Sequence, residues 1–398
     1  MISQKIGILN PINGIQKLNM HSTIQYIRDL YNQQEAFIPL HEPRFFGNEK
    51  KYLNECIDST FVSSVGKFVD QFEEDVAKFT GAKYAVATAN GTAALHISLI
   101  LAGVTLDDEV ITQPLTFIAT PNAISYIGAH PVFVDVDKQT LGLSPEKLEH
   151  FLSENTEMVK GECVNKTTKR KIKAVVPMHT FGLPAKIDEI ITICNGYNIA
   201  VVEDAAESLG SYYKKQHTGT FGLLGSLSFN GNKTITTGGG GMIITNNQEL
   251  AIKAKHITTT AKIPHPWDFD HDMIGFNYRL PNINAALGCA QMENLPLILE
   301  KKRQLAAKYQ SFFKNTSFQY IPEPENSVAN YWLNAIVLEN IDERNNFLKM
   351  SNEQGVMTRP IWKLMNNLSI YRSAQVGNLE NAEWLEERTI NIPSSVRV

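Results

Sequence analysis

The sequence of 398 residues has few cysteines, little net charge and no long hydrophobic run. Its four cysteines, Cys56, Cys163, Cys194 and Cys289, lie far apart and form no C-x-x-C pair, so zinc and redox motifs have no support. A formal net charge of −4 gives no electrostatic reason to expect nucleic acid or an anionic membrane as a partner. No apolar run approaches the roughly 20 residues that span a bilayer, and no secretory signal peptide is visible. We therefore expect reduced thiols, no metal site and a cytoplasmic location.

What the sequence does contain is an alternation of short apolar runs and helical segments. Because parallel strands need crossover helices between them, this alternation predicts an α/β fold with a mainly parallel, seven-stranded sheet covered on both faces. Near-continuous apolar runs are typical of strands that are buried on both sides. The seven runs cover residues 84–89, 109–114, 130–136, 173–179, 199–205, 225–230 and 241–246.

Helical patterns flank this region on both sides. Residues 20–36 predict an amphipathic helix, and Gly81 is placed to stop another helix whose apolar stripe includes Phe68 and Phe72. Residues 280–315 predict a long helix that Pro296 interrupts, followed by mixed strands and helices. We therefore divide the chain into an N-terminal helix and active-site loop (1–50), a large domain (51–300) and a smaller α+β domain (301–398).

One lysine stands out in the stretch SLSFNGNKTITTGGGGMIIT, residues 226–245, where Lys233 precedes four glycines. A Walker A loop would need a glycine directly before the lysine, but Asn232 intervenes. No G-x-G-x-x-G joins a first strand to a helix either. Lys233 is therefore either a solvated loop residue or a covalent anchor for a cofactor. The glycine run is better explained by close backbone packing where the chain re-enters the sheet.

Other positions match what a lysine-anchored cofactor requires. Asp204 ends a predicted strand, at the sheet edge where open α/β folds bind ligands. Gly91 and Thr92 open a predicted helix, whose free N–H groups favour a phosphate. Phe117 follows another strand. Each has an ordinary alternative, such as a cap, a turn or a core aromatic, but their order along the chain favours a site for pyridoxal phosphate (PLP).

These motifs resemble those of the fold-type I PLP aminotransferases that act on nucleotide-linked keto-sugars, the DegT/DnrJ/StrS family. The resemblance covers nearly the whole chain from about residue 38, through ANGTAALH, VVEDAAESLG, SFNGNKTITTGGGGMI and GFNYRLPNINAALGCAQ in family order. It implies an aspartate-aminotransferase-like large PLP-binding domain with a smaller α+β C-terminal domain. Within the family, IPLHEPRFFGNEKKY (38–52) and STFVSSVGKFVDQFE (59–73) look most like the LegC-type branch.

The resemblance also implies roles for the matching residues. Lys233 matches the lysine that bonds to PLP and moves the proton, Asp204 the partner of the pyridine nitrogen, and Phe117 the stacking ring. Gly91 and Thr92 match the phosphate-binding backbone.

Further matches concern the phosphate, the ring hydroxyl and the substrate. Ser228 matches a phosphate-binding serine, and Glu207 replaces the Gln or His that many relatives place near the ring hydroxyl. Asn277 matches an asparagine that reaches the PLP phosphate of the neighbouring subunit, which implies a homodimer with shared active sites. The candidate substrate contacts are His179, Asn230, Arg44 and His41.

The implied reaction transfers an amino group, with glutamate as donor, to C4 of a nucleotide-linked 4-keto-6-deoxy-(N-acetyl)hexosamine on a route to bacillosamine or legionaminic acid. Amination at C3 and a GDP-perosamine-synthase-like reaction are the alternatives, and the nucleotide is left open between UDP and GDP. A desulfurase would need a reactive cysteine on a mobile loop. A non-catalytic PLP-fold binding protein would be expected to lose Lys233 or Asp204, and both are present.

Overall fold

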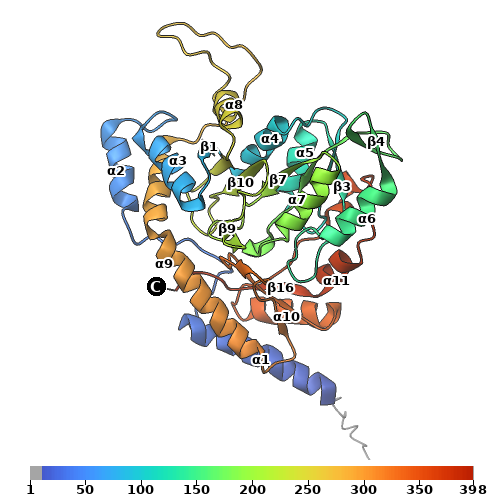
Figure 1. Cartoon of the computed structure of the whole chain (residues 1–398). Coiled ribbons are helices and arrows are strands. Elements are labelled where there is room, and N and C mark those ends of the chain that lie inside the picture. The colour runs from blue at the N-terminus through green and yellow to red at the C-terminus, as the bar shows by residue number, and fades with distance from the viewer. Residues whose placement is uncertain (1–10, 398) are drawn as a thin grey trace, which may run out of the picture.

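The computed structural model describes residues 11–397, and its centre is a seven-stranded sheet (Figure 1). The strands are β1 (Tyr84–Thr88), β2 (Glu109–Thr112), β3 (His130–Phe133), β6 (Ile172–Val176), β7 (Ala200–Asp204), β10 (Leu224–Ser228) and β11 (Gly241–Thr245). Their order is β1-β11-β10-β7-β6-β2-β3. Six of these strands run in the same direction, and β11 runs in the opposite direction. The predicted mainly parallel α/β sheet is confirmed, and each predicted run overlaps one of its strands, although β6 and β10 begin one residue before their runs.

Helices cover both faces of this sheet. On one face, α6 and α7 pack side chains such as Phe151 and Ile190 against Ile111. On the other face, α4 and α5 pack against Val110, the neighbour of Ile111 in the same strand. Because successive strand residues point to opposite faces, both must be apolar here. The helices of this domain are α2 (Glu49–Ser59), α3 (Lys67–Thr80), α4 (Gly91–Leu101), α5 (Ala119–Tyr126), α6 (Pro145–Asn155), α7 (Ile187–Gly196), α8 (Gln248–Thr258) and α9 (Asn282–Phe313).

Helix α3 ends where the sequence predicts. Gly81 takes a left-handed conformation with φ 75° and donates its N–H to Ala77 O. Such a conformation favours glycine because it has no Cβ. The C-terminus of α3 is therefore fixed by one residue type.

Helix α9 differs from the prediction, because it runs through Pro296 without interruption over 32 residues. A proline lacks the N–H that would bond to the carbonyl four residues earlier, and this normally breaks or kinks a helix. Here Leu295, Ile298 and Leu299 are buried on both sides of the proline in the core of the large domain. This continuous burial offsets the missing bond, and the predicted interruption is wrong.

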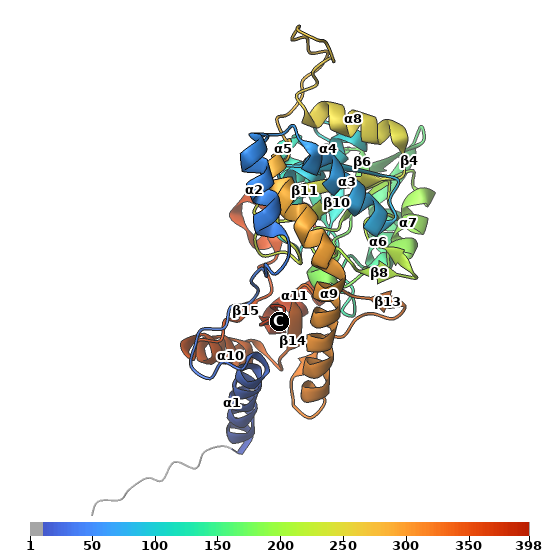
Figure 2. The same ribbon diagram turned by 90° about the vertical axis from the view of Figure 1, so that its left-hand side faces the viewer.

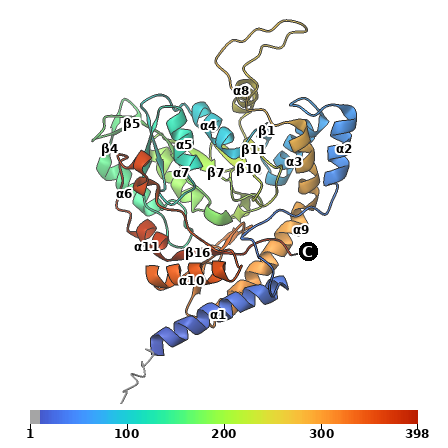
Figure 3. The ribbon, with the colours of Figure 1, turned by 180° about the vertical axis from the view of Figure 1, so that it is seen from behind.

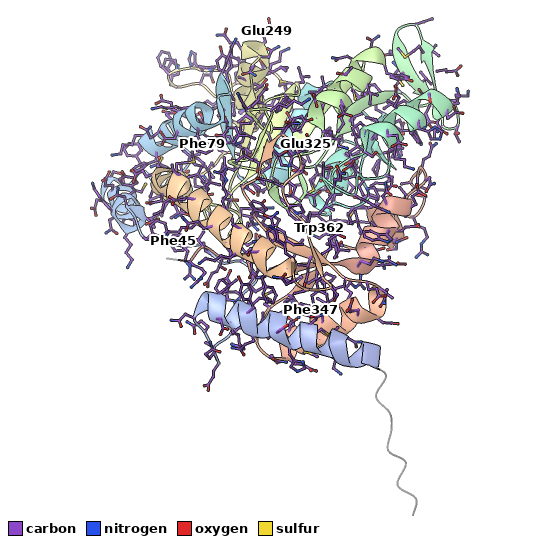
Figure 4. All side chains as sticks on the ribbon, turned by 60° about the horizontal axis from the view of Figure 1, so that its bottom comes forward. Phe45, Phe79, Glu249, Glu325, Phe347 and Trp362 are labelled. Carbon is purple, nitrogen blue, oxygen red and sulfur yellow. The ribbon has the colours of Figure 1, made fainter. Side chains whose placement is uncertain are left out.

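The second half of α9 belongs to another core, which it shares with α1 and with residues from the last part of the chain up to Ile392. Ile24 and Ile27 of α1 share that core with Phe347, which Figure 4 shows close to α1. The predicted helix at 20–36 exists, but it begins earlier and ends at Tyr31. Figures 2 and 3 show α1, α10 and the end of α9 below the large sheet. This region contains α1 (Pro11–Tyr31), α10 (Ile341–Glu353), α11 (Glu380–Arg388), β12 (Gln319–Tyr320), β14 (Asn334–Val337), β15 (Arg359–Pro360) and β16 (Thr389–Ile392).

Short elements complete the fold. A hairpin of β4 and β5 and a small sheet of β8, β9 and β13 lie outside the central sheet. A long loop between α8 and α9 extends away from the body (Figure 1). In residues 11–397 no helix is long and apolar enough to cross a membrane, and no group of His, Cys, Asp and Glu is arranged to hold a metal ion. The short elements are β4 (Thr156–Val159), β5 (Glu162–Asn165), β8 (Tyr212–Tyr213), β9 (Gln216–His217), β13 (Ser327–Val328) and 3-10 turns at Thr180–Gly182, Met365–Asn367 and Ser369–Tyr371.

Candidate active site

Four of the predicted site residues lie at one edge of the central sheet. Asp204 is the last residue of β7 and Ser228 the last residue of β10. Gly91 begins α4 shortly after β1 ends, and Phe117 follows β2. These strands are parallel to one another, so their carboxyl ends meet at the same edge, where open α/β sheets bind ligands.

Lys233 lies in a closed loop after β10. Its own N–H donates to Asn230 O at 3.0 Å, which forms a tight turn. The loop is closed at its base because Phe229 N donates to Gly240 O at 2.8 Å and Thr237 N donates to Phe229 O at 3.0 Å. The Lys233 side chain is only 14% exposed. The amine is thus held in one region rather than solvated on a flexible loop.

Two groups contact the Lys233 amine. Its Nζ lies 3.3 Å from Glu207 Oε1, and 4.0 Å from the centre of the Trp332 ring. A cation over an aromatic face is attracted by the negative charge of that face. Trp332 is also fixed to the Lys233 loop, because its Nε1 donates to Asn232 O at 2.6 Å.

Glu207 is a buried carboxyl group beside this amine. Its Oε2 accepts a hydrogen bond from Phe181 N at 2.9 Å. Burial raises the pKa of Glu207 to about 7, and the charge of Asp204 adds to the rise while Lys233 opposes it. Near neutral pH, both the protonated and the ionised form of Glu207 are therefore populated.

Asp204 is also buried and accepts two hydrogen bonds. Its Oδ2 accepts from Thr120 Oγ1 at 2.7 Å, and its Oδ1 accepts from Ala206 N at 3.2 Å. A carboxylate held in this way is suited to face a protonated ring nitrogen, since an ionised carboxylate only accepts hydrogen bonds.

At the start of α4, two glycines let neighbouring segments approach closely and form a cradle for a phosphate. A Cβ added to Gly91 would lie 2.7 Å from Ser228 Cβ, and one added to Gly241 would lie 2.3 Å from Asn90 O. The first N–H groups of a helix have no carbonyl partner within it, so those of Gly91 and Thr92 are available to an anion. Gly241, the last residue of the glycine run, thus lets β11 pass closely behind this cradle.

Phe117 completes the fit to PLP. Its ring is 51% exposed, whereas its neighbours Leu115 and Thr116 are buried. A ring that remains accessible beside a buried strand end is available to stack on a flat ligand. The anchor amine, the carboxylate, the ring and the phosphate cradle all have the chemistry that PLP requires.

The candidate substrate contacts differ in their exposure. The structure places His179 in the interior, where its Nε2 lies 2.9 Å from Glu203 Oε2 and its Nδ1 accepts from Ala185 N at 3.1 Å. Both ring nitrogens therefore bond to protein groups, which favours a structural role. Asn230 is exposed in the Lys233 turn.

Two further candidates come from the N-terminal loop. Arg44 is partly exposed, with its Nη2 at 2.6 Å from Glu42 Oε1 and its Nε donating to Val396 O at 3.1 Å. His41 contacts the buried Lys302 at 3.0 Å. A substrate that reached Arg44 would compete with Glu42 for the guanidinium.

Asn277 lies away from the other site residues of its own chain. It is exposed at the base of the long loop, and its Oδ1 accepts from Arg279 Nε at 3.0 Å. Within the described residues, no contact joins Asn277 to Lys233, Asp204 or Glu207.

The comparisons with known proteins agree with this geometry. The model of the DegT/DnrJ/EryC1/StrS aminotransferase family matches residues 45–398. The chain belongs to this family. It is 37% identical over 358 residues to a GDP-perosamine synthase of Escherichia coli O157:H7, with 90% of this chain and 93% of that protein covered.

Two further relatives agree with that membership. The chain is 37% identical over 362 residues to EpsN of Bacillus subtilis (strain 168), whose name proposes a pyridoxal phosphate-dependent aminotransferase, with 90% of each chain covered. The aminotransferase TlmJ from Streptoalloteichus hindustanus has the same fold, with a TM-score of 0.82, 26% identity, and 90% of this chain and 94% of that chain covered. The protein is thus a PLP-dependent nucleotide-sugar aminotransferase with a fold-type I architecture.

Several residues of the site escape sequence reasoning. Trp332 and Asn330 carry no motif and reach the site from a distant segment, whereas Thr120 lies only three residues after Phe117, in α5. Asn330 Nδ2 donates to the carbonyl oxygens of Glu207 and Leu209, both at 2.9 Å.

Proposed function

We propose that this aminotransferase transfers the amino group of glutamate to C4 of a nucleotide-linked 4-keto-6-deoxy sugar. The observation that carries the proposal is the Lys233 amine, held between Glu207 and Trp332 at the sheet edge where Asp204 lies. Residues 38–52 and 59–73, which resemble the LegC-type branch, support an N-acetylated sugar. The similarity to GDP-perosamine synthase supports a GDP-linked sugar as the second candidate.

In this mechanism PLP supplies the aldehyde carbon that takes up the amino group and a ring that stabilises negative charge on the substrate carbon. Lys233 would anchor PLP and, once released, move a proton at its Nζ. Glu207 Oε1, at 3.3 Å, is placed to take up or return that proton because the pKa of Glu207 is about 7.

Other residues would hold the cofactor and not react. Asp204 would accept a hydrogen bond from the ring nitrogen, and Phe117 would stack on the ring. Gly91, Thr92 and Ser228 would hold the phosphate at the start of α4.

We further propose a homodimer in which Asn277 serves the neighbouring active site. Its exposed position on its own chain supports this, as does the apolar surface of the adjoining loop. Trp267, Phe269 and Ile274 in that loop are 80%, 77% and 87% exposed. Exposed apolar groups of this size favour contact with another protein surface.

The decisive experiment is an absorbance spectrum of the purified protein with PLP, followed by turnover assays. We expect a visible band from the bond between Lys233 and PLP, and its loss in Lys233→Ala. Glutamate with a panel of UDP- and GDP-linked 4-keto and 3-keto sugars then identifies the acceptor. Absence of any band in the wild type would refute PLP binding, whereas amination of 3-keto sugars alone would refute the choice of C4.

A further inference from the structure

A buried lysine lies behind the Lys233 loop and has no role in the mechanism above. Lys302 is on α9 and is only 1% exposed. Its Nζ lies 2.8 Å from Ser394 O, 3.2 Å from Trp332 O and 3.0 Å from His41 Nε2. None of these is a carboxylate. Because a buried ammonium is costly unless its donors are satisfied, three acceptors for three N–H groups form a complete set.

The three acceptors belong to three separate segments. His41 is in the N-terminal loop, Trp332 precedes β14, and Ser394 follows β16. Lys302 therefore joins the N-terminal loop to the smaller core at a point next to the Lys233 loop. Since Lys302 donates to His41 Nε2, a neutral His41 carries its proton on Nδ1. Burial and the nearby cations Lys302 and Lys233 lower the pKa of His41 well below its usual value, which keeps it neutral.

Trp332, one of the three residues that accept from Lys302, contacts the Lys233 loop at two points. Trp332 Nε1 donates to Asn232 O at 2.6 Å, and its ring lies 4.0 Å from Lys233 Nζ. The backbone of Asn232 also affects the pKa of His41, which it raises against the lowering effect of burial. Any shift of His41 or Trp332 would therefore move the groups that contact Lys233 and its loop.

We propose that Lys302 is a positioning residue for Lys233. Its ammonium holds His41 and the Trp332 backbone in place, and Trp332 in turn fixes the position of Lys233 Nζ through its ring and the Asn232 carbonyl. The proposal rests on the proposed function, because it takes Lys233 as the amine that anchors PLP.

The charge of Lys302 makes the positioning dependent on pH. Burial lowers the pKa of Lys302 to about 7, so the ammonium with three donors exists below that pH and a neutral amine with two donors above it. The charged groups that act on the adjoining His41 ring are Lys233 and Arg44, and Glu42 is paired with Arg44. As pH rises through about 7, one of the three contacts is lost and Trp332 is held less firmly.

The test compares Lys302→Met, which keeps an unbranched chain but removes the amine, with Lys308→Met, at an exposed lysine on the same helix. In the PLP-free protein we measure hydrogen exchange of residues 37–44 and 229–234. With PLP, glutamate and the accepted sugar, we measure kcat and KM between pH 6 and pH 9. His41→Ala, a change in the N-terminal loop, is the second variant if Lys302→Met fails to fold.

We expect faster exchange of both segments in Lys302→Met and His41→Ala. We expect kcat to fall about tenfold, the scale of one lost charge-assisted hydrogen bond, with KM for glutamate within about threefold of the wild type. The decline of wild-type kcat above about pH 7 should disappear in Lys302→Met. The proposal is overturned if Lys302→Met has the same exchange and the same kcat as Lys308→Met. It is also overturned if His41→Ala exchanges more slowly and loses no kcat. Failure of the wild type to bind PLP would refute the proposed function, while the exchange data on the PLP-free protein would still judge the contacts of Lys302.

Discussion

At the scale of single residues, the state of Lys233 depends on two unlike neighbours. The Trp332 ring favours a cation on Nζ, at 4.0 Å from the ring centre. Glu207 would favour the same cation if it were ionised, but its burial favours the neutral carboxyl. The contact between Lys233 and Glu207 at 3.3 Å is therefore an ion pair only while Glu207 is ionised, a state that burial disfavours.

The raised pKa of Glu207 predicts a pH effect on stability. Between the ordinary value of 4.5 and about 7, Glu207 stays protonated when folded but ionises when unfolded. Its contribution to folded-state stability therefore falls as pH rises through this window. Glu207→Gln is neutral at every pH, so its thermal midpoint should rise relative to that of the wild type from pH 5 to pH 8 in the PLP-free protein.

The control for this measurement is Glu325→Gln, at an exposed carboxyl. Its midpoint relative to the wild type should not depend on pH in the same window. A constant difference between Glu207→Gln and the wild type would mean that Glu207 ionises in the folded protein as readily as in the unfolded chain.

The residues that carry chemistry were also those that the sequence could reveal. Lys233 and Asp204 are reactive residue types at strand ends, where the topology makes a site. Trp332 and Lys302 are ordinary residues of a strand region and a long helix. Their roles arise from contacts between segments far apart in the chain, and no local pattern records those contacts.

At the scale of elements, the strands buried on both faces were predictable and the small ones were not. A strand such as β7 gives a continuous apolar run because helices cover both of its sides. Strands of two residues, such as β8 and β9, are too short to show any period. The predicted interruption at Pro296 was wrong because burial in the core keeps α9 continuous, and a local sequence pattern does not record that tertiary effect.

The close approach of α4 to β10 predicts the effect of Gly91→Ala. The added Cβ would lie 2.7 Å from Ser228 Cβ and 3.3 Å from Leu227 O, so the start of α4 must move away. We expect the Kd for PLP to rise at least about tenfold, because moving the first turn of α4 displaces several N–H groups that would bind the phosphate. Fluorescence titration of the PLP-free protein measures this.

Gly196→Ala is the matched control, since it is also a helical glycine but has no atom within 4 Å of the added Cβ. It should leave PLP binding unchanged and stabilise α7 by about 0.5–1 kcal/mol. Equal PLP affinity in the two variants would show that the Gly91 cradle does not hold the phosphate.

At the scale of the whole molecule, one chain brings most of the cofactor site together but leaves Asn277 outside it. The N-terminal loop and the C-terminal segment meet next to the Lys233 loop, where Lys302 joins His41 to Ser394 O. The loop that leads to Asn277 points away from the body of the molecule (Figure 2). This placement fits the proposal that Asn277 serves the active site of another copy of the chain.

This arrangement predicts that two inactive variants restore activity when they form mixed dimers. Lys233→Ala and Asn277→Ala should each be nearly inactive alone. In a mixed dimer, one site receives Lys233 from one chain and Asn277 from the other. Random exchange makes half of the dimers mixed, and each has one complete site of two, so activity should recover to about a quarter of the wild type. Two different affinity tags identify the mixed dimers. If these are isolated and remain inactive, Asn277 does not act across the interface.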